Sequence, residues 1–117
     1  MCNHMVVRSE LADAEIDAIF HALADATRRD IVARVIEREQ SVTELAARYA
    51  MSFAAVQKHV VVLQRASLVA KERRGREQIV RPRREAVARA RRLLDDYERL
   101  WGARIERMQD ILEEGNG

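Results

Sequence analysis

SFAAVQKHVVVL, residues 52–63, predicts a helix with two chemically different faces. Val56, Val60 and Leu63 follow one another at i, i+4 and i+7, so they form an apolar stripe that a protein core can cover. Ser52 precedes this stripe and is a favourable N-cap residue. The helix therefore begins where the free N–H groups of its first turn can face outward.

Several residues of this stretch lie outside the apolar stripe and are small, carry an amide or are basic. They include Ser52, Ala55, Gln57, Lys58 and His59. Small residues let a backbone approach DNA closely, an amide can pair with a base edge in the major groove, and a cation can reach a phosphate. We therefore predict that this face binds DNA. An ordinary amphipathic helix on a core explains the same stretch equally well, so the neighbouring sequence has to decide.

The composition is that of a folded, mainly helical protein. Apolar residues make up 48% of the chain and charged residues 34%, which excludes a disordered chain. We expect a single domain over residues 1–117, with residues 1–10 flexible because they show no hydrophobic period. No apolar run approaches ~20 residues and no signal-peptide segment is evident, so we expect a cytoplasmic protein without a membrane span.

Metal-binding residue types are sparse. Cys2 is the only cysteine, which excludes an internal disulfide and fits a reducing compartment. Cys2 and His4 lie close together, but two ligands near an aperiodic terminus do not make a metal site. We expect no metal and no cofactor.

The charges are unevenly distributed along the chain. Residues 58–92 carry 12 Lys or Arg against 3 Glu, a net charge of +9. Residues 1–57 have a net charge of −3 and residues 93–117 of −4, which together give the overall +2. A basic segment inside an otherwise acidic chain indicates a polyanionic partner, although a solvated arginine-rich surface has the same composition.

The residues before position 52 predict three helices. Residues 11–24 place apolar side chains on one helix face, and His21 lies off that face. Asp25 is a suitable N-cap for a second helix over residues 26–38. The predicted buried face of this second helix consists of Ile31, Val32, Val35 and Ile36.

A capping box predicts the start of the third helix. Ser41 and Glu44 have the spacing at which the two side chains cap each other's backbone. The helix is short and breaks near Ala50, and Ser52 then begins the fourth helix. A short helix, a tight turn and a second helix with a polar first turn form a helix-turn-helix.

A hairpin with a basic tip follows. Residues 68–73 and 78–81 read as strands, joined by residues 74–76 (RGR). A two-stranded hairpin is not stable alone, so it must pack on the helices. The arginines of its tip are Arg73, Arg74 and Arg76. Beside a helix-turn-helix we predict that they touch phosphates or the minor groove, whereas a loop that only adds solubility is the alternative.

The last helix is predicted over residues 84–114. At 1.5 Å per residue it is ~45 Å long, and a domain of this size cannot cover its apolar stripe. A second copy of the same helix is the simplest partner, with the first helix added to the interface. The predicted dimer-interface residues are Ile16, Phe20, Leu94, Tyr97, Trp101, Ile105 and Met108. The predicted fold is mainly α with a small β-hairpin: a winged helix-turn-helix with five helices and a long C-terminal dimerisation helix.

Four segments resemble the ArsR (arsenical-resistance-repressor) family of winged-helix regulators. Residues 23–32 (LADATRRDIV) resemble its LADPTRRxIL signature, and residues 41–46 (SVTELA) its next motif. Residues 52–60 (SFAAVQKHV) resemble its SxxAVSKHL recognition helix, and residues 63–69 (LQRASLV) its LxxAGLV connection to the wing. The resemblance implies a symmetric dimer that represses by occupying a palindromic operator and releases the DNA when an inducer binds.

The departures from the family pattern are specific. Metal sensors of the family carry a cysteine pair at the positions of Ala46 and Arg48, and other sensors use histidines on the last helix, which has none here. The chain therefore resembles the members that lack metal ligands. Ser67 stands where Gly is usual, which should cost a little at the turn, and Gln57 stands where Ser is usual, which should change base preference.

A dimeric repressor that binds double-stranded DNA is the leading hypothesis. The first alternative is a protein-interaction module with the same fold, which would not need arginines on the recognition helix and wing. The second is a non-specific nucleic-acid binder, which would show no sequence preference. An enzyme is least favoured, because Cys2 and three scattered histidines offer no nucleophile–base pair and no glycine-rich phosphate loop is present.

Overall fold

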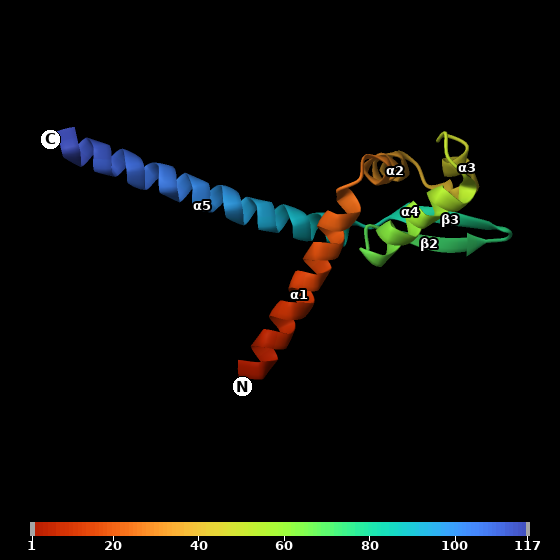
Figure 1. The fold of residues 1–117 in the computed structure, drawn as a ribbon, viewed down its shortest axis with the longest axis horizontal. Helices are drawn as coiled ribbons and strands as arrows, with labels where there is room; N and C mark the ends of the chain where they lie inside the picture. The colour runs from red at the N-terminus through yellow and green to blue at the C-terminus, as the bar shows by residue number, and fades with distance from the viewer. Residues whose placement is uncertain (1, 117) are drawn as a thin grey trace.

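The computed structural model describes the backbone of residues 2–116 and the side chains of residues 12–115. It contains five helices and three short strands in this range (Figure 1). In chain order they are α1 (Cys2–Leu23), α2 (Ala26–Glu37), β1 (Gln40–Ser41), α3 (Val42–Ala46), α4 (Phe53–Arg65), β2 (Val69–Arg74), β3 (Glu77–Pro82) and α5 (Arg84–Asn116).

The N-terminal part of α1 and most of α5 project from a body that the remaining elements form together with the other ends of these two helices. Figure 1 shows α5 leaving the body as a long arm, and α1 leaving it in a different direction. At 1.5 Å per residue α5 is about 50 Å long, so it accounts for most of the 72 Å length of the molecule. None of the helices over the described residues has a stretch long and apolar enough to cross a lipid bilayer.

The first helix begins earlier than its hydrophobic pattern predicts. It starts at Cys2, whereas the pattern starts near residue 11 and residues 1–10 were expected to be flexible. Residues 2–23 contain neither Gly nor Pro, so nothing in the sequence ends the helix on its N-terminal side. The side chains of Cys2 and His4 lie outside those described.

The sheet has one strand more than the predicted hairpin. Its order is β1-β3-β2 and both pairs are antiparallel. The added strand β1 pairs Gln40 with Val80 and Ser41 with Ile79. Two residues are too few to show a strand periodicity, and the sequence marks Ser41 as a helix cap, which it also is.

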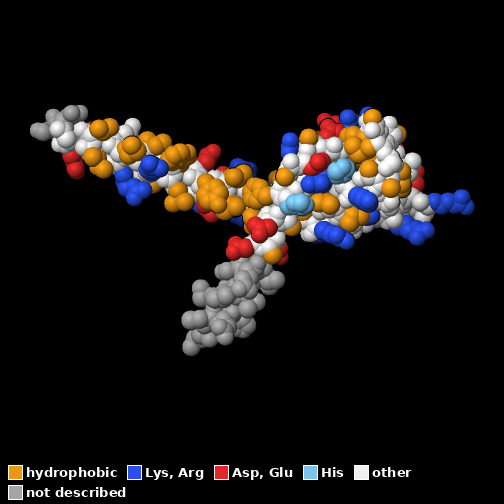
Figure 2. Space-filling view, in the orientation of Figure 1, with side chains coloured by type: hydrophobic (Ala, Val, Ile, Leu, Met, Phe, Trp, Pro, Cys, Tyr) orange, Lys and Arg blue, Asp and Glu red, His pale blue; other side chains and the backbone are white. Residues whose placement is uncertain are grey.

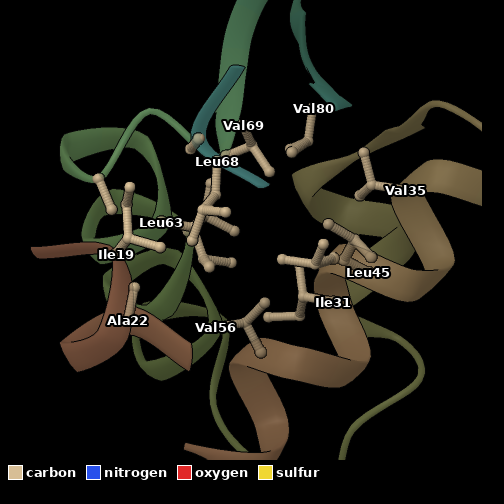
Figure 3. Packing of buried hydrophobic residues seen from close by; sticks show 14 of the residues in the cluster. Ile19, Ala22, Ile31, Val35, Leu45, Val56, Leu63, Leu68, Val69 and Val80 are labelled. Carbon is tan, nitrogen blue, oxygen red and sulfur yellow. The ribbon is translucent and has the colours of Figure 1, made fainter. Parts of the chain in front are cut away.

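The core lies where α1, α2, α3 and α4 meet the sheet. Side chains from all of these elements converge there, including Ile19, Ile31, Leu45 and Val80 (Figure 3). The predicted stripe of α4 is confirmed, because Val56, Val60 and Leu63 are completely buried. These side chains fix which face of α4 turns outward.

The predicted buried face of α2 is wrong at one residue. Ile31, Val32 and Val35 are buried, but Ile36 is 61% exposed. Ile36 lies at the end of α2 that faces the start of α5, where a cleft remains between the two helices.

A polar contact ties α2 to the turn after α3. The Tyr49 hydroxyl donates to Asp30 Oδ2 at 2.5 Å, and Arg34 Nε donates to the same oxygen at 2.8 Å. The Tyr49 hydroxyl and the Arg34 guanidinium lower the pKa of Asp30, and burial together with Asp30 raises the pKa of Tyr49 to about 12. The turn before α4 is therefore held to α2.

Candidate nucleic-acid interface

Two side-chain caps shape the helix-turn-helix. The Glu44 N–H donates to Ser41 Oγ at 3.0 Å, and the Ser41 hydroxyl donates back to Glu44 Oε1 at 3.4 Å. The Ala55 N–H donates to Ser52 Oγ at 3.1 Å. Both predicted N-caps are confirmed, and each satisfies a first-turn donor that would otherwise need water.

The outward face of α4 carries the predicted DNA-binding residues with different exposures. Ser52 and Lys58 are exposed, whereas Ala55, Gln57 and His59 are half-buried. Gln57 and Lys58 line a shallow groove along the helix together with Ala54, Val61 and Arg65. The sequence reasoning missed these last three residues. The sequence does indicate them, because residues 54, 58, 61 and 65 follow one another at helical spacing on the side opposite the buried stripe.

His59 turns toward the protein. Its Nδ1 lies 3.4 Å from Nη1 of Arg28 and 3.9 Å from Oδ2 of Asp25. The Arg28 backbone N–H donates to the same Asp25 oxygen at 3.0 Å and lowers the pKa of Asp25. His59 therefore ties α4 to the α1–α2 junction.

Two arginines after the Asp25 cap close the end of α1. Arg28 donates from Nε to the Ala22 carbonyl at 2.7 Å and from Nη2 to the His21 carbonyl at 2.9 Å. Arg29 donates from Nη1 to the Leu23 carbonyl at 2.7 Å. These carbonyls are the unsatisfied acceptors of a helix C-terminus. The paired arginines of the segment 23–32 thus join α1 to the helix-turn-helix, a role that sequence reasoning did not assign.

The wing is the hairpin of β2 and β3 with Gly75 and Arg76 at its tip. Gly75 has φ of +61° and stands first in a two-residue connection, where a positive φ matches the twist of the strands. Basic side chains project beyond the tip (Figure 2). This glycine lets the tip turn tightly and present its basic side chains.

The three tip arginines lie in different surroundings. Arg73 lies on the same face of β2 as Val69, which is buried at the other end of the strand. The Arg73 Nε donates to the Gly75 carbonyl at 3.3 Å. Neither Arg73 nor Arg76 has an ion-pair partner among the described side chains. Arg74 is on the opposite face and lies 3.1 Å from a carboxylate oxygen of Glu72.

Arg74 belongs to a cluster of four charges on that opposite face. Glu39 and Glu72 each lie between Arg74 and Arg81, with nitrogen–oxygen distances of 3.0–3.5 Å. The two carboxylates, Glu39 first, raise the pKa of Arg81. Because Arg74 already has anionic partners, it is less available to a phosphate than Arg73 or Arg76.

Comparison with known proteins gives the family. A family model described as a helix-turn-helix domain matches residues 23–72. The solved structure of an ArsR-like transcriptional regulator from a Rhodococcus species is 32% identical, over 84% of this chain and 92% of that chain, with a TM-score of 0.74. The chain belongs to the ArsR family of transcriptional regulators.

Two further ArsR-family structures have a similar fold. A crystal structure of an ArsR family transcriptional regulator is 27% identical, over 77% of this chain and 93% of that chain, with a TM-score of 0.74. The homodimeric winged helix-turn-helix DNA-binding domain of a possible ArsR-family regulator from Mycobacterium bovis is 25% identical, over 78% of this chain and 83% of that chain, with a TM-score of 0.63. No protein of curated function matches the sequence.

The metal site of ArsR metal sensors does not fit this chain. The positions of the sensor cysteines hold Ala46 and Arg48, which supply no usable ligand. Within the described side chains, no three His, Cys, Asp or Glu residues come together in a way that could hold a metal ion. Asp95 and Asp96 of α5 instead face Arg91 and Arg99 respectively.

The predicted dimer residues of this ArsR-family chain lie on α1 and along α5. Ile16 is half-buried against the core, and Phe20 is exposed beside it. Five large apolar side chains of the arm stand at least half exposed: Leu94, Tyr97, Trp101, Ile105 and Met108. Figure 2 shows this apolar surface running along the arm. Phe20, Leu94 and Tyr97 also line a hollow between α1 and α5.

Proposed function

We propose that this protein is a homodimeric transcriptional repressor that binds a palindromic operator in double-stranded DNA. The observation that supports this most strongly is the outward face of α4. Its polar and basic side chains stand opposite a completely buried stripe, and β2 of the basic wing packs beside the helix. A helix held in this way can enter the major groove while the wing contacts the flanking backbone.

Different side chains read the bases and the phosphates in this proposal. Gln57 and Ala55 face base edges from the first two turns of α4, and Ser52 and Lys58 contact phosphates beside them. On the wing, Arg73 and Arg76 contact phosphates.

Dimerisation through α5 gives the operator its symmetry. The apolar stripe at positions 94, 97, 101, 105, 108 and 112 averages 3.6 residues per step, so it runs straight along the helix and offers a continuous seam to a second copy. Support comes from the Mycobacterium bovis relative, which is described as homodimeric. The two recognition helices should address half-sites one helical turn apart, ~34–36 Å.

Selection of bound sequences from a random duplex pool tests this function. The expected result is an inverted repeat with the half-site spacing given above. Gln57→Ala should then relax specificity at one base pair of each half-site, whereas Arg76→Ala should weaken all duplexes alike. Arg74→Ala serves as the matched wing control, and its smaller effect follows from its carboxylate partners.

Two outcomes would overturn the proposal in different ways. Binding without sequence preference, with a steep salt dependence only, would make the protein a general nucleic-acid binder. A folded dimer that enriches no duplex would favour the protein-interaction module.

A further inference from the structure

A cleft lies where the wing ends and the arm begins. It has a volume of about 460 Å³, within the range of small-molecule pockets. Its walls come from α2 through Val32 and Ile36, from the base of the hairpin through Leu68 and Pro82, and from α5 through Val87. Ile36 is 61% exposed and Val87 45% exposed, so two large apolar side chains stand uncovered in it.

Three arginines also line this cleft, which we call the arginine-rimmed cleft. They are Arg83, Arg84 and Arg91. Arg83 faces Glu85 and Arg91 faces Asp95, each at 3.8 Å and exposed to solvent. Arg84 has no ion-pair partner among the described side chains, and no acidic residue lines the cleft. An apolar floor with a cationic rim is complementary to a molecule with an apolar body and an anionic end.

We propose that the arginine-rimmed cleft binds a small amphipathic carboxylate and that this ligand is the effector of the regulator. Guanidinium groups recognise carboxylates through paired N–H donors, and the exposed Ile36 and Val87 would cover the apolar body. The cleft shares no residue with the proposed DNA-reading face of α4 or with the seven proposed dimer residues.

The position of the cleft gives the ligand a means of acting on DNA binding. The Arg83 N–H donates to the Leu68 carbonyl at 3.1 Å, which closes the base of the wing immediately before α5. Close packing of α5 on the body relies on the small residues Ala86 and Ala90. A ligand seated between α2 and α5 would shift the arm relative to the winged unit, and with it the spacing of the two recognition helices.

A calorimetric titration of the full-length protein with decanoate tests the site. Decanoate supplies a carboxylate on an apolar chain, and 1-decanol is the same chain without the charge. We expect one decanoate per chain and markedly weaker binding of 1-decanol. Equal binding of the two compounds would overturn the role of the arginines.

Substitutions locate the site. The double variant Arg84→Gln/Arg91→Gln should weaken decanoate binding about tenfold, since each exposed charge contributes modestly. Arg92→Gln is the matched control, because Arg92 is an exposed arginine of the same helix outside the cleft, and its affinity should be unchanged. If the double variant binds decanoate like the parent, the ligand lies elsewhere and the proposal fails.

A second copy of the chain is the competing occupant. In that case decanoate binding would weaken as the protein concentration rises, and Ile36→Gln would lower the dimer affinity. Either result would overturn a ligand site here.

The effector role rests on the proposed function, so it is measured separately on the selected operator. Decanoate at a concentration that just saturates the parent should lower operator affinity at least about fivefold, and the double variant should need about tenfold more decanoate for the same decrease. Decanoate binding without any change in operator affinity would overturn the effector role. Absence of DNA binding would refute the proposed function, while the calorimetric result would still decide the site.

Discussion

Replacing Ser67 by Gly should raise the free energy of unfolding. Ser67 links α4 to β2 with φ of 59°, and it is the one non-glycine residue with positive φ in the described chain. Its N–H donates to the Gln64 carbonyl and the Leu68 N–H to the Leu63 carbonyl, both at 3.0 Å. These two bonds form a Schellman motif, and the buried Leu63 and Leu68 supply its apolar contact. Ser67 occupies the position at which this motif favours Gly.

The magnitude follows from two opposing terms. A residue with a β-carbon in the left-handed region costs about 1–2 kcal/mol relative to the right-handed one. Glycine loses more backbone entropy on folding, about 0.5–1 kcal/mol. The difference favours Ser67→Gly by about 0.5–1 kcal/mol. At about 2.1 cal/mol/K per residue for 117 residues, this raises Tm by about 2–4 °C.

Thermal unfolding followed by circular dichroism measures the effect. All variants are compared at one protein concentration, because the stability of a dimer depends on it. Ser67→Ala is the control, since it removes the hydroxyl but keeps the β-carbon, and it should give no gain. Equal Tm changes for the Gly and Ala variants, or a lower Tm for Gly, would refute the conformational argument.

Three further substitutions test the caps, the charges and the arm. Ser52→Ala should lower the free energy of unfolding in urea by about 1 kcal/mol, and an unchanged midpoint would mean that water caps α4 equally well. The Tyr49 hydroxyl lowers the pKa of Asp30 below 3.8. The ionised carboxylate therefore stabilises the fold above about pH 4, and this stability is lost as the pH falls through the pKa of Asp30 in the folded protein. Asp30→Asn should therefore flatten the acid limb of a stability–pH curve, and an unaltered limb would contradict this. Trp101→Asp should give monomers in sedimentation velocity, because Trp101 lies on the exposed apolar stripe of α5. Ala103→Asp, on the opposite side of α5, is the control and should leave dimers. If both variants remain dimers, Trp101 is not part of the interface.

Local chemistry made the helix-turn-helix predictable. Asp25, Ser41 and Ser52 each cap a helix through their own side chain, and capping depends only on residues three positions away. The stripe of α4 was equally readable, because a helix period determines which side chains share a face. Family membership follows from the same segments, and the comparisons confirm it.

Features that depend on long-range packing were not predictable. Ile36 continues the apolar pattern of α2, yet 61% of it stays exposed, because a cleft remains between it and the start of α5. Arg74 looks like its neighbours in sequence, but pairing with Glu39, from a distant segment, gives it different surroundings. The contacts of Arg28 with the end of α1 and with His59 likewise join segments whose proximity only the fold reveals.

The central claim is tested most directly by titrating the purified protein with DNA from upstream of its own coding sequence. A scrambled duplex of equal length is the control, and both are measured at several salt concentrations. We predict that a dimer binds the natural duplex with a Kd on the order of 10⁻⁸–10⁻¹¹ M at physiological salt, at least about 10³-fold more tightly than the scrambled one. The affinity for both should fall steeply as salt rises. Equal affinity for the two duplexes at every salt concentration would contradict the claim that α4 reads sequence.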